Sequence, residues 1–408
     1  MFFFAISIFL SAFLLFQIQP MIGKFILPWF GGTPAVWSTT MLFFQVLLTG
    51  GYAYAYWLIG RVKSNRQSLI HIILSVFAML VLAALAFFWK SPITPPASLK
   101  PADVSAPILN IFKLLIISVG LPYFVLASNG PLMQAWFSRI FPQGSYARLY
   151  SLSNLGSLLG LLAYPVLIEP NLSLKDQGWF WSIGFMLFGL LVITLAFKNR
   201  HAAPLADLVV ATVSSSGRPS SALLSLWIIL SGTASLLLLS ITNQISQEVA
   251  VIPFLWILPL TLYLLSFILT FSGEGGYNRR LYIILFAISV CLLIFVLVKI
   301  ESASIYLQIL VYCLLMFSAS MLCHGELYLL RPQAQHLTSF YFMVSIGGAL
   351  GGIFTSLIAP LIFDGYWEFM VALAMALALW LTVFRAGRVN NHSAWARFML
   401  TVFLIVTV

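Results

Sequence analysis

Residues 281–298 read LYIILFAISVCLLIFVLV, a run without a single charged side chain. An apolar run of roughly 18 residues or more is long enough to cross the hydrocarbon core of a bilayer as a helix. Similar runs recur along the chain, which is 62% hydrophobic and 7% charged. A typical soluble domain is about 25% charged. Because so few charges cannot cover a water-facing surface, the composition predicts a polytopic membrane protein surrounded by lipid.

The apolar runs do not alternate with polar residues, which favours helices over a membrane β-barrel. We therefore predict an all-α fold with about twelve transmembrane helices. The expected spans are 2–28, 35–59, 68–89, 107–129, 146–168, 178–197, 222–243, 249–272, 281–299, 303–323, 337–363 and 367–384. The last apolar stretch, Phe398–Val408, is too short to span and is typical of the start of a further, truncated helix.

These spans divide the chain into four segments. Residues 1–197 form a first six-helix membrane half, and residues 222–385 form a second one. The polar stretch 198–221 between them is expected to be a cytoplasmic linker. Residues 386–408 hold a basic loop and the start of the truncated helix. We expect the chain to be the membrane part of a longer protein.

Lysine and arginine are concentrated in one alternating set of loops, which includes Arg61, Lys63 and Arg66. Cytoplasmic loops carry an excess of these residues. The bias predicts that both termini face the cytoplasm, most simply in a bacterial inner membrane. The net charge of +10 does not indicate nucleic acid binding, because the basic residues lie singly in short loops and form no dense stripe.

The two halves share features in the same order, as an internal repeat does. Ser128–Leu132 ends the fourth expected helix and Cys323–Leu327 ends the tenth. Glycine rows follow on the fifth and eleventh helices, at Gly156 and Gly160 and again at Gly347, Gly348, Gly351 and Gly352, and each runs into a proline, Pro165 or Pro360. With six helices in each half, equivalent helices have the same orientation, so we predict parallel repeats. Glycine rows let helices approach closely in lipid, either as static packing or as a moving interface.

Several polar side chains lie at membrane depth, where they are costly and normally face protein or a water-filled cavity. The candidates for a cavity that binds a polar solute are Gln17, Gln19, Lys24, Asn154, Asn243, Gln244 and Glu248. In the alternative interpretation, Lys24 and Glu248 extend to the outer membrane interface, and Asn154 only bridges helices.

A second group lies at the expected cytoplasmic helix ends: Asn129, Arg139, His324, Glu326 and Arg331. The sequence Cys323-His324-Gly325-Glu326 carries metal-binding residue types, but ligands on a helix are usually three or four residues apart. We therefore prefer a polar cluster that bonds Arg331 or docks a cytoplasmic partner. No phosphate-binding loop, nucleophile elbow or metalloprotease motif occurs, so we expect no catalytic residue, metal or cofactor here.

Several segments resemble the membrane-embedded spermidine-synthase-like proteins: Phe9–Ala12, Gln17–Lys24, Gly31–Trp37, Pro253–Leu262, Cys323–Leu327 and Phe340–Gly352. The resemblance implies a transporter-like membrane domain fused to a Rossmann-type domain that binds S-adenosylmethionine or its decarboxylated form. In its six-plus-six plan, the membrane part also resembles the major facilitator superfamily. The loop Gly60–Arg66 departs from that superfamily, because it lacks the usual acidic residue.

Two hypotheses follow. In the first, the domain is an integral membrane transporter that moves a small polar or amphipathic solute by alternating access. In the second, it is the membrane part of a spermidine-synthase-like enzyme, an aminopropyltransferase or methyltransferase that would receive a membrane-borne substrate at a cytoplasmic catalytic domain.

Overall fold

The computed structural model describes residues 1–31, 34–89, 91–101, 106–141, 146–213, 219–248, 255–273, 275–299, 303–333 and 336–381. All regular elements in these ranges are helices, which confirms the all-α prediction. The chain divides into two compact units: Met1–Pro219 with Pro332–Phe342, and Ser220–Arg331 with Met343–Val408. Each unit is described by itself.

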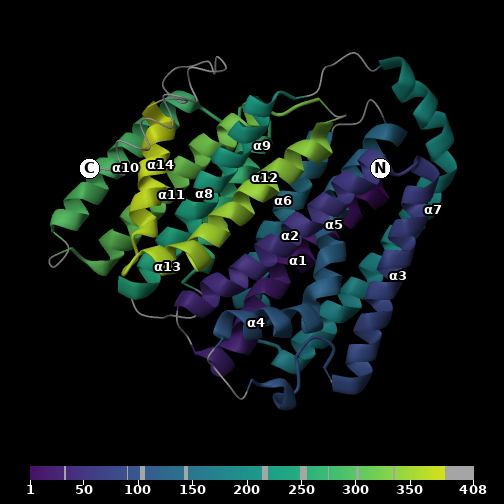
Figure 1. Cartoon of the computed structure of the whole chain (residues 1–408), viewed down its shortest axis with the longest axis horizontal. Helices are drawn as coiled ribbons and strands as arrows, with labels where there is room; N and C mark the ends of the chain where they lie inside the picture. The colour runs from purple at the N-terminus through teal and green to yellow at the C-terminus, as the bar shows by residue number, and fades with distance from the viewer. Residues whose placement is uncertain are drawn as a thin grey trace. The chain divides into compact units, whose positions relative to one another are not determined.

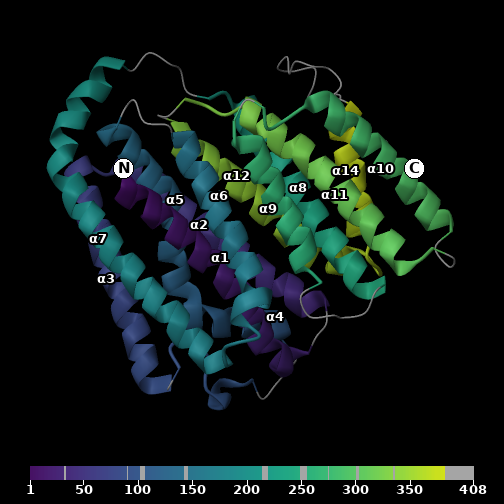
Figure 2. The ribbon, with the colours of Figure 1, turned by 180° about the vertical axis from the view of Figure 1, so that it is seen from behind.

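The first unit contains the helices of the first predicted half (Figure 1). They are α1 (Phe2–Phe30), α2 (Pro34–Arg61), α3 (Ser64–Trp89), the short 3₁₀-helix η1 (Ala97–Leu99), α4 (Pro107–Leu115), the π-helix η2 (Ile116–Gly120), α5 (Leu121–Ile140), α6 (Tyr146–Ala163), the π-helix η3 (Tyr164–Ile168) and α7 (Leu174–Val213). Helix α1 packs along α5, α6 and α7, while α2 packs on α5 and α3 on α7 (Figures 1 and 2).

The second unit contains α8 (Ser221–Glu248), α9 (Ile257–Phe271), α10 (Arg279–Val298), α11 (Ile305–Leu329), the π-helix η5 (Phe354–Ile358), α13 (Ala359–Ile362), α14 (Glu368–Leu379) and most of α12 (Leu337–Ile353). Helix α11 packs against α8, α9 and α10 (Figure 2). The side chains of Asn278 and Ser304 accept hydrogen bonds from the backbone N–H groups of Leu281 and Leu307 and so cap α10 and α11.

Ten helical segments in the described residues are long and apolar enough to cross a membrane. Helices α4 and α5 with η2 count as one of them, Pro107–Ile140. Two shorter apolar helices, Ile257–Phe271 and Glu368–Leu379, bring the set to the twelve predicted from sequence. The chain is therefore an integral membrane protein with six apolar helices in each half.

Both predicted glycine rows lie in helix–helix contacts. A Cβ atom on Gly156 would come within 2.6 Å of the carbonyl oxygen of Phe9, and one on Gly160 would meet the carbonyl oxygen of Phe13. The row therefore lets the backbone of α6 lie directly against the backbone of α1, and the two helices run in the same direction. In lipid, such close approach gains van der Waals contact that larger residues would prevent.

The second unit repeats this arrangement between α12 and α8. A Cβ on Gly347 would overlap Ser231 and the carbonyl oxygen of Ile228, and one on Gly351 would lie 3.0 Å from the carbonyl oxygen of Gly232. The hydroxyl of Ser235 also donates to the carbonyl oxygen of Gly348 at 2.9 Å. The prediction that the fifth and eleventh helices face protein neighbours is thus confirmed.

Each glycine helix continues into a π-helical turn beside its proline. Helix α6 gives way to η3, which contains Pro165, and α12 gives way to η5, which ends just before Pro360. Proline removes an N–H and crowds the carbonyl four residues earlier, so a wider turn at these sites has a direct cause. π-Turns inside helices are rare and are frequently found at functional sites.

Helix α7 continues to Val213, so part of the predicted linker 198–221 is helical. The predicted truncated helix in 386–408 lies outside the described residues, as does the side chain of Glu248.

Candidate functional site

Helix α1 holds a seam of polar groups that begins near its start. The Asn129 side chain on α5 donates to the Ser11 hydroxyl at 2.8 Å and to the Ser7 carbonyl oxygen at 3.1 Å. The Ser7 hydroxyl donates to Asn129 Oδ1 at 3.3 Å. Asn129 is completely buried, and these bonds satisfy its amide. Asn129 therefore ties α5 to α1.

Gln17 and Gln19 lie near the middle of α1, and both are buried. Neither polar atom of the Gln17 side chain has a hydrogen-bond partner, although only 2% of the residue is exposed. Gln19 donates from Nε2 to the Tyr123 hydroxyl at 3.4 Å, while its Oε1 has no partner. The two side chains point to nearly opposite sides of α1, because residues two positions apart on a helix are rotated by about 200°. Sequence reasoning had placed them in one cavity without this distinction.

Gln17 continues the row that α1 presents to the glycine helix. Phe9 and Phe13 meet Gly156 and Gly160, and a further step of four residues on each helix leads to Gln17 and to Tyr164. Tyr164 is the first residue of η3. An unpaired buried carboxamide therefore lies at the level where the α-helix becomes a π-helix.

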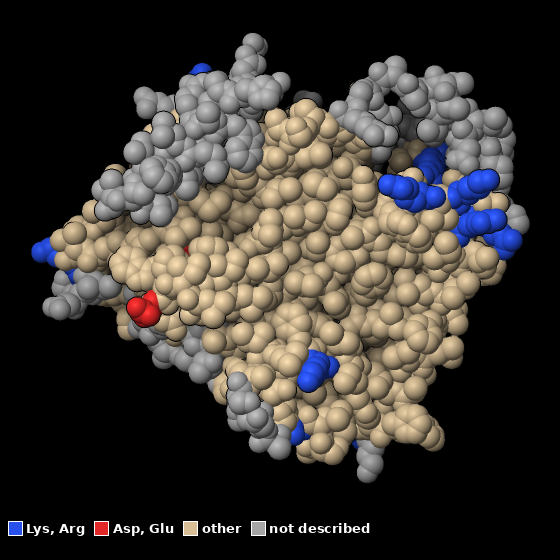
Figure 3. All heavy atoms as spheres, in the orientation of Figure 1, with Lys and Arg blue, Asp and Glu red and all other residues tan. Residues whose placement is uncertain are grey.

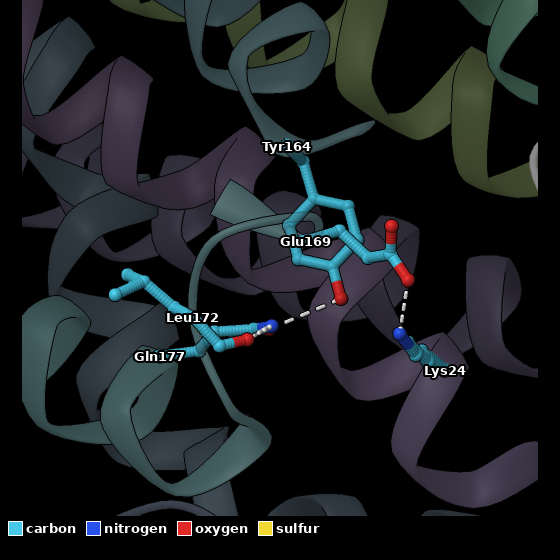
Figure 4. A network of polar contacts seen from close by, with 5 residues as sticks. All are labelled: Lys24, Tyr164, Glu169, Leu172 and Gln177. Carbon is cyan, nitrogen blue, oxygen red and sulfur yellow. Dashed lines mark hydrogen bonds and ion pairs between the residues drawn. The ribbon is translucent and has the colours of Figure 1, made fainter. Parts of the chain in front are cut away.

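Lys24 is ion-paired with Glu169 at the far end of the seam (Figure 4). Their side chains are 37% and 27% exposed, so water still reaches the pair. Beside it, the Tyr164 hydroxyl donates to Gln177 Oε1 at 3.1 Å, and Gln177 Nε2 donates to the Leu172 carbonyl oxygen at 2.9 Å. This network joins α1, η3 and the start of α7. Lys24 thus has a protein partner, as well as access to the membrane interface.

Asn154 lies on α6, two residues before Gly156, so it points away from the face that meets α1. The residue is buried, and its Nδ2 has no hydrogen-bond partner. A purely bridging role between helices would pair this nitrogen. Its orphaned donor therefore fits the cavity interpretation better than the bridging one.

In the second unit, Asn243 of α8 donates to Glu368 Oε1 at 3.2 Å. Both residues are buried, and Glu368 is 4% exposed. Gln244, the next residue, also has polar interactions. Glu368 begins α14 and was not among the residues chosen from sequence. The sequence feature that could have identified Glu368 is its position as a single acid directly before an Ala- and Leu-rich span.

Glu326 is held by Arg279 in a two-point ion pair. Arg279 Nε donates to Oε1 at 2.7 Å, and Nη2 contacts Oε2. The Tyr277 hydroxyl donates to the same carboxylate at 3.1 Å. Burial, and then the charge of Glu326, raise the pKa of Tyr277 above its usual range, so this hydroxyl stays a donor. Arg331, which the sequence predicts in the same polar cluster, donates to the Tyr328 carbonyl oxygen at 2.7 Å and covers the Tyr328 ring.

His324 is fully buried between aromatic rings of α9. Its Nδ1 lies 2.7 Å from the Ser266 hydroxyl, and its ring stacks on Phe267. Among the described residues, no group of three or more His, Cys, Asp or Glu side chains could hold a metal ion. His324 therefore joins α11 to α9.

The predicted cytoplasmic cluster consists of separate contacts. Arg139 donates to Gln67 Oε1 at 2.9 Å and to the Ser64 hydroxyl at 3.1 Å, at the start of α3. Asn129 lies ten residues earlier on the same helix, roughly 15 Å away along its axis. Asn129 and Arg139 belong to the first unit, and His324, Glu326 and Arg331 to the second.

No family model matches the sequence, and no curated protein matches it. Solved structures do match. The xylose transporter XylE from E. coli, in a partially occluded inward-open conformation, is 14% identical with a TM-score of 0.60, over 94% of this chain and 97% of that one. The POT family transporter PepTSo is 13% identical with a TM-score of 0.55, over 99% and 96%. A structure of XylE described as a major facilitator superfamily proton:xylose symporter is 12% identical with a TM-score of 0.53, over 100% and 95%.

The chain has the major-facilitator fold. The expectation of a major-facilitator-like membrane domain, drawn from the six-plus-six plan, is therefore confirmed. Identities this low establish the fold alone.

Proposed function

We propose that this chain is a transporter domain that moves a small polar or amphipathic solute by alternating access of its two halves. The observation that carries the proposal is Gln17, whose buried side chain has two unpaired polar atoms. Leaving a buried polar group without a hydrogen bond costs roughly 1–3 kcal/mol. We infer that the Gln17 carboxamide pairs with a polar solute that enters during transport, which offsets this cost.

Further orphaned groups support the same proposal. Gln19 Oε1 and Asn154 Nδ2 also lack partners, so the first unit offers both acceptors and donors inside its helices. The carboxamides are neutral, and Lys24 and Glu169 neutralise one another. These properties suit a polar solute without a large net charge. The structural neighbours named above are described as xylose and POT family transporters, and sugars are solutes of this kind.

The test is Gln17→Leu, which removes the two unpaired atoms at similar volume. We expect the thermal midpoint of the purified protein to stay equal or rise, while transport is lost. The control is Gln308→Leu, since Gln308 donates to the Ala303 carbonyl oxygen at 3.2 Å. That variant should melt earlier and still transport.

Because the solute is unidentified, a thermal-shift panel of sugars, amino acids, dipeptides and polyamines on the wild type comes first. Any compound that raises the midpoint is then followed as radiolabelled uptake into proteoliposomes. A panel without a single hit contradicts the proposal, and so does a Gln17→Leu protein that transports at the wild-type rate.

We also propose a bacterial inner-membrane location with both termini in the cytoplasm, and 198–221 as a cytoplasmic linker between the halves. The support is the concentration of Lys and Arg in one set of loops. Single cysteines at Lys63 and at Lys175 test this arrangement. A membrane-impermeant maleimide added to whole cells should label the cysteine at 175 and spare the one at 63.

The enzyme alternative rests on sequence resemblance to the membrane-embedded spermidine-synthase-like proteins. The structural neighbours are transporters and give it no support. The coding sequence downstream of Val408 separates the two hypotheses, since a strand followed by a Gly-rich loop, with an acidic residue about 20 positions on, would favour the enzyme.

A further inference from the structure

Five exposed basic residues gather at one end of the first unit: Arg61, Lys63, Arg66, Lys198 and Arg200. We call them the basic patch. Arg61 ends α2, Lys63 and Arg66 flank the start of α3, and the other two lie on α7 at the end of its apolar span, Leu174–Arg200. In Figure 3, Lys and Arg side chains cluster at this end of the unit.

Specific contacts hold the patch together. Between Lys198 and Arg200, the buried Asn199 donates from its side chain to the Ser68 hydroxyl on α3 at 3.1 Å. That bond fixes the end of α7 beside the start of α3, two residues from Arg66. The turn before Arg66 is closed by its own N–H, which donates to the Lys63 carbonyl oxygen at 2.9 Å. The patch is thus a built feature of three helices.

Where side chains are described, no acid neutralises the charge of the patch. Among the described side chains of the first unit, the acids are Glu169 and Asp176. Glu169 pairs with Lys24, and Asp176 lies in the first turn of α7, roughly 36 Å along the helix from Arg200. Arg139 adds a further cation where it bonds Ser64 and Gln67. The patch therefore attracts anions.

Apolar surface continues directly from the patch. Leu69 and Ile73 on α3 are exposed, and so are Leu190 and Phe197 on α7. These side chains lie on helices that are long and apolar enough to cross a membrane, and exposed apolar side chains on such helices are expected to contact lipid tails. A ligand that fits both parts has an anionic head and long hydrocarbon chains, which a free phosphate or an acidic protein lacks.

We propose that the basic patch binds the headgroup of an anionic phospholipid, whose acyl chains lie along the exposed apolar side chains of α3 and α7. Several basic residues beside a membrane span form the kind of surface that recognises anionic lipid heads. The site is saturable and lies on one unit, independent of any solute. It therefore stands whether or not the transport proposal holds.

The experiment titrates purified protein in neutral detergent with phosphatidylglycerol or with phosphatidylcholine and follows the thermal midpoint. The thermal midpoint of the wild-type protein should rise at much lower concentrations of phosphatidylglycerol than of phosphatidylcholine. The triple variant R61Q/K63Q/R66Q should bind phosphatidylglycerol roughly a hundredfold more weakly, because each basic residue near an anionic surface contributes roughly fivefold. The double variant K198Q/R200Q should lose somewhat less affinity for phosphatidylglycerol. The charge-conserving variant R61K/K63R/R66K should bind it as tightly as the wild type.

The matched control is K175Q, which removes an exposed lysine from the opposite end of α7 and should keep wild-type affinity. If a patch variant fails to fold, raising the salt concentration on wild-type protein gives a second measurement, since screening should weaken the response to phosphatidylglycerol and spare that to phosphatidylcholine. The proposal is overturned if the patch variants keep full affinity, if K175Q loses as much, or if glycerol 1-phosphate reproduces the effect of the lipid.

Discussion

The two units repeat a backbone contact but not the polar groups around it. In each, a glycine helix lies against the first helix of its half, α6 on α1 and α12 on α8, and then enters a π-turn beside a proline. Past that turn, the first unit has an unpaired Gln17 and an exposed pair of Lys24 with Glu169. The second has Glu368, buried with Asn243.

A second pair of matched residues shows the same divergence. Asn129 and His324 match in the sequence repeat, but Asn129 lies inside α5 (Leu121–Ile140) and bonds α1, whereas His324 lies near the end of α11 and bonds α9. Two residues after this matched pair, the first unit has Pro131 and the second unit has Glu326. Close backbone packing restricts a position to glycine, while polar side chains between helices can change partners. The repeat therefore preserves the backbone contact between the helices, while the polar contacts around it differ.

The largest effect is expected from breaking the ion pair of the second unit, whose carboxylate is buried. Arg279→Gln leaves the Glu326 carboxylate, which is 2% exposed, without its cation. Losing one partner of a buried pair costs about 3–5 kcal/mol, so we expect little folded protein after detergent extraction. Size-exclusion chromatography with a fluorescent tag measures the yield.

Glu326→Gln should be milder, because it removes the buried charge and leaves Arg279 partly in water. The double variant Arg279→Gln, Glu326→Gln should recover much of what Arg279→Gln loses. Equal loss in all three proteins would show that the carboxylate is not the costly group.

A smaller effect is expected at the feature that both units share. Gly160→Ala drives a methyl group into the Phe13 backbone, and overpacking of this kind costs about 1–3 kcal/mol. Gly347→Ala should be similar, since its Cβ would overlap Ser231 and the Ile228 carbonyl oxygen. Thermal unfolding in detergent reports both.

Gly348→Ala is the matched control, because a Cβ there meets nothing within 4 Å. It should be neutral or stabilising by about 0.5–1 kcal/mol, as alanine favours helices over glycine. If Gly160→Ala were as stable as Gly348→Ala, the packing of α6 on α1 would not depend on close backbone contact.

The sequence predicted the fold well because helix length, apolar content and glycine spacing are local properties. Gly156 and Gly160 were recognisable as a contact row from their spacing alone. The site was harder. Lys24 was among the predicted site residues, but its partner Glu169, 145 residues away along the chain, was not. Glu368 was passed over, because burial depends on neighbours from α8 that no local pattern reveals. The pairing of Glu326 with Arg279 joins residues 47 positions apart.

The next effect tests the buried contact of the second unit. Asn243→Leu removes the hydrogen bond to Glu368 and leaves a buried carboxylate with one partner fewer. We expect a loss of about 1.5–3 kcal/mol, as for hydrogen bonds to charged groups, seen as a lower thermal midpoint. Glu368→Gln should be neutral or stabilising, because a carboxamide costs less to bury and can still accept from Asn243. A destabilised Glu368→Gln protein would instead indicate that the negative charge itself stabilises this helix end.

The smallest effect is expected at the exposed pair of the first unit. Lys24→Met should change stability by about 0.2–1 kcal/mol, because water and salt screen a partly exposed ion pair. Added salt should reduce even this difference, whereas the loss in Asn243→Leu should persist, since that contact is buried. The control is Lys24→Glu with Glu169→Lys, which restores the pair with reversed charges and should melt like the wild type. If Lys24→Met were as destabilising as Arg279→Gln, the two units would depend equally on their ion pairs, and exposure would not explain how they differ.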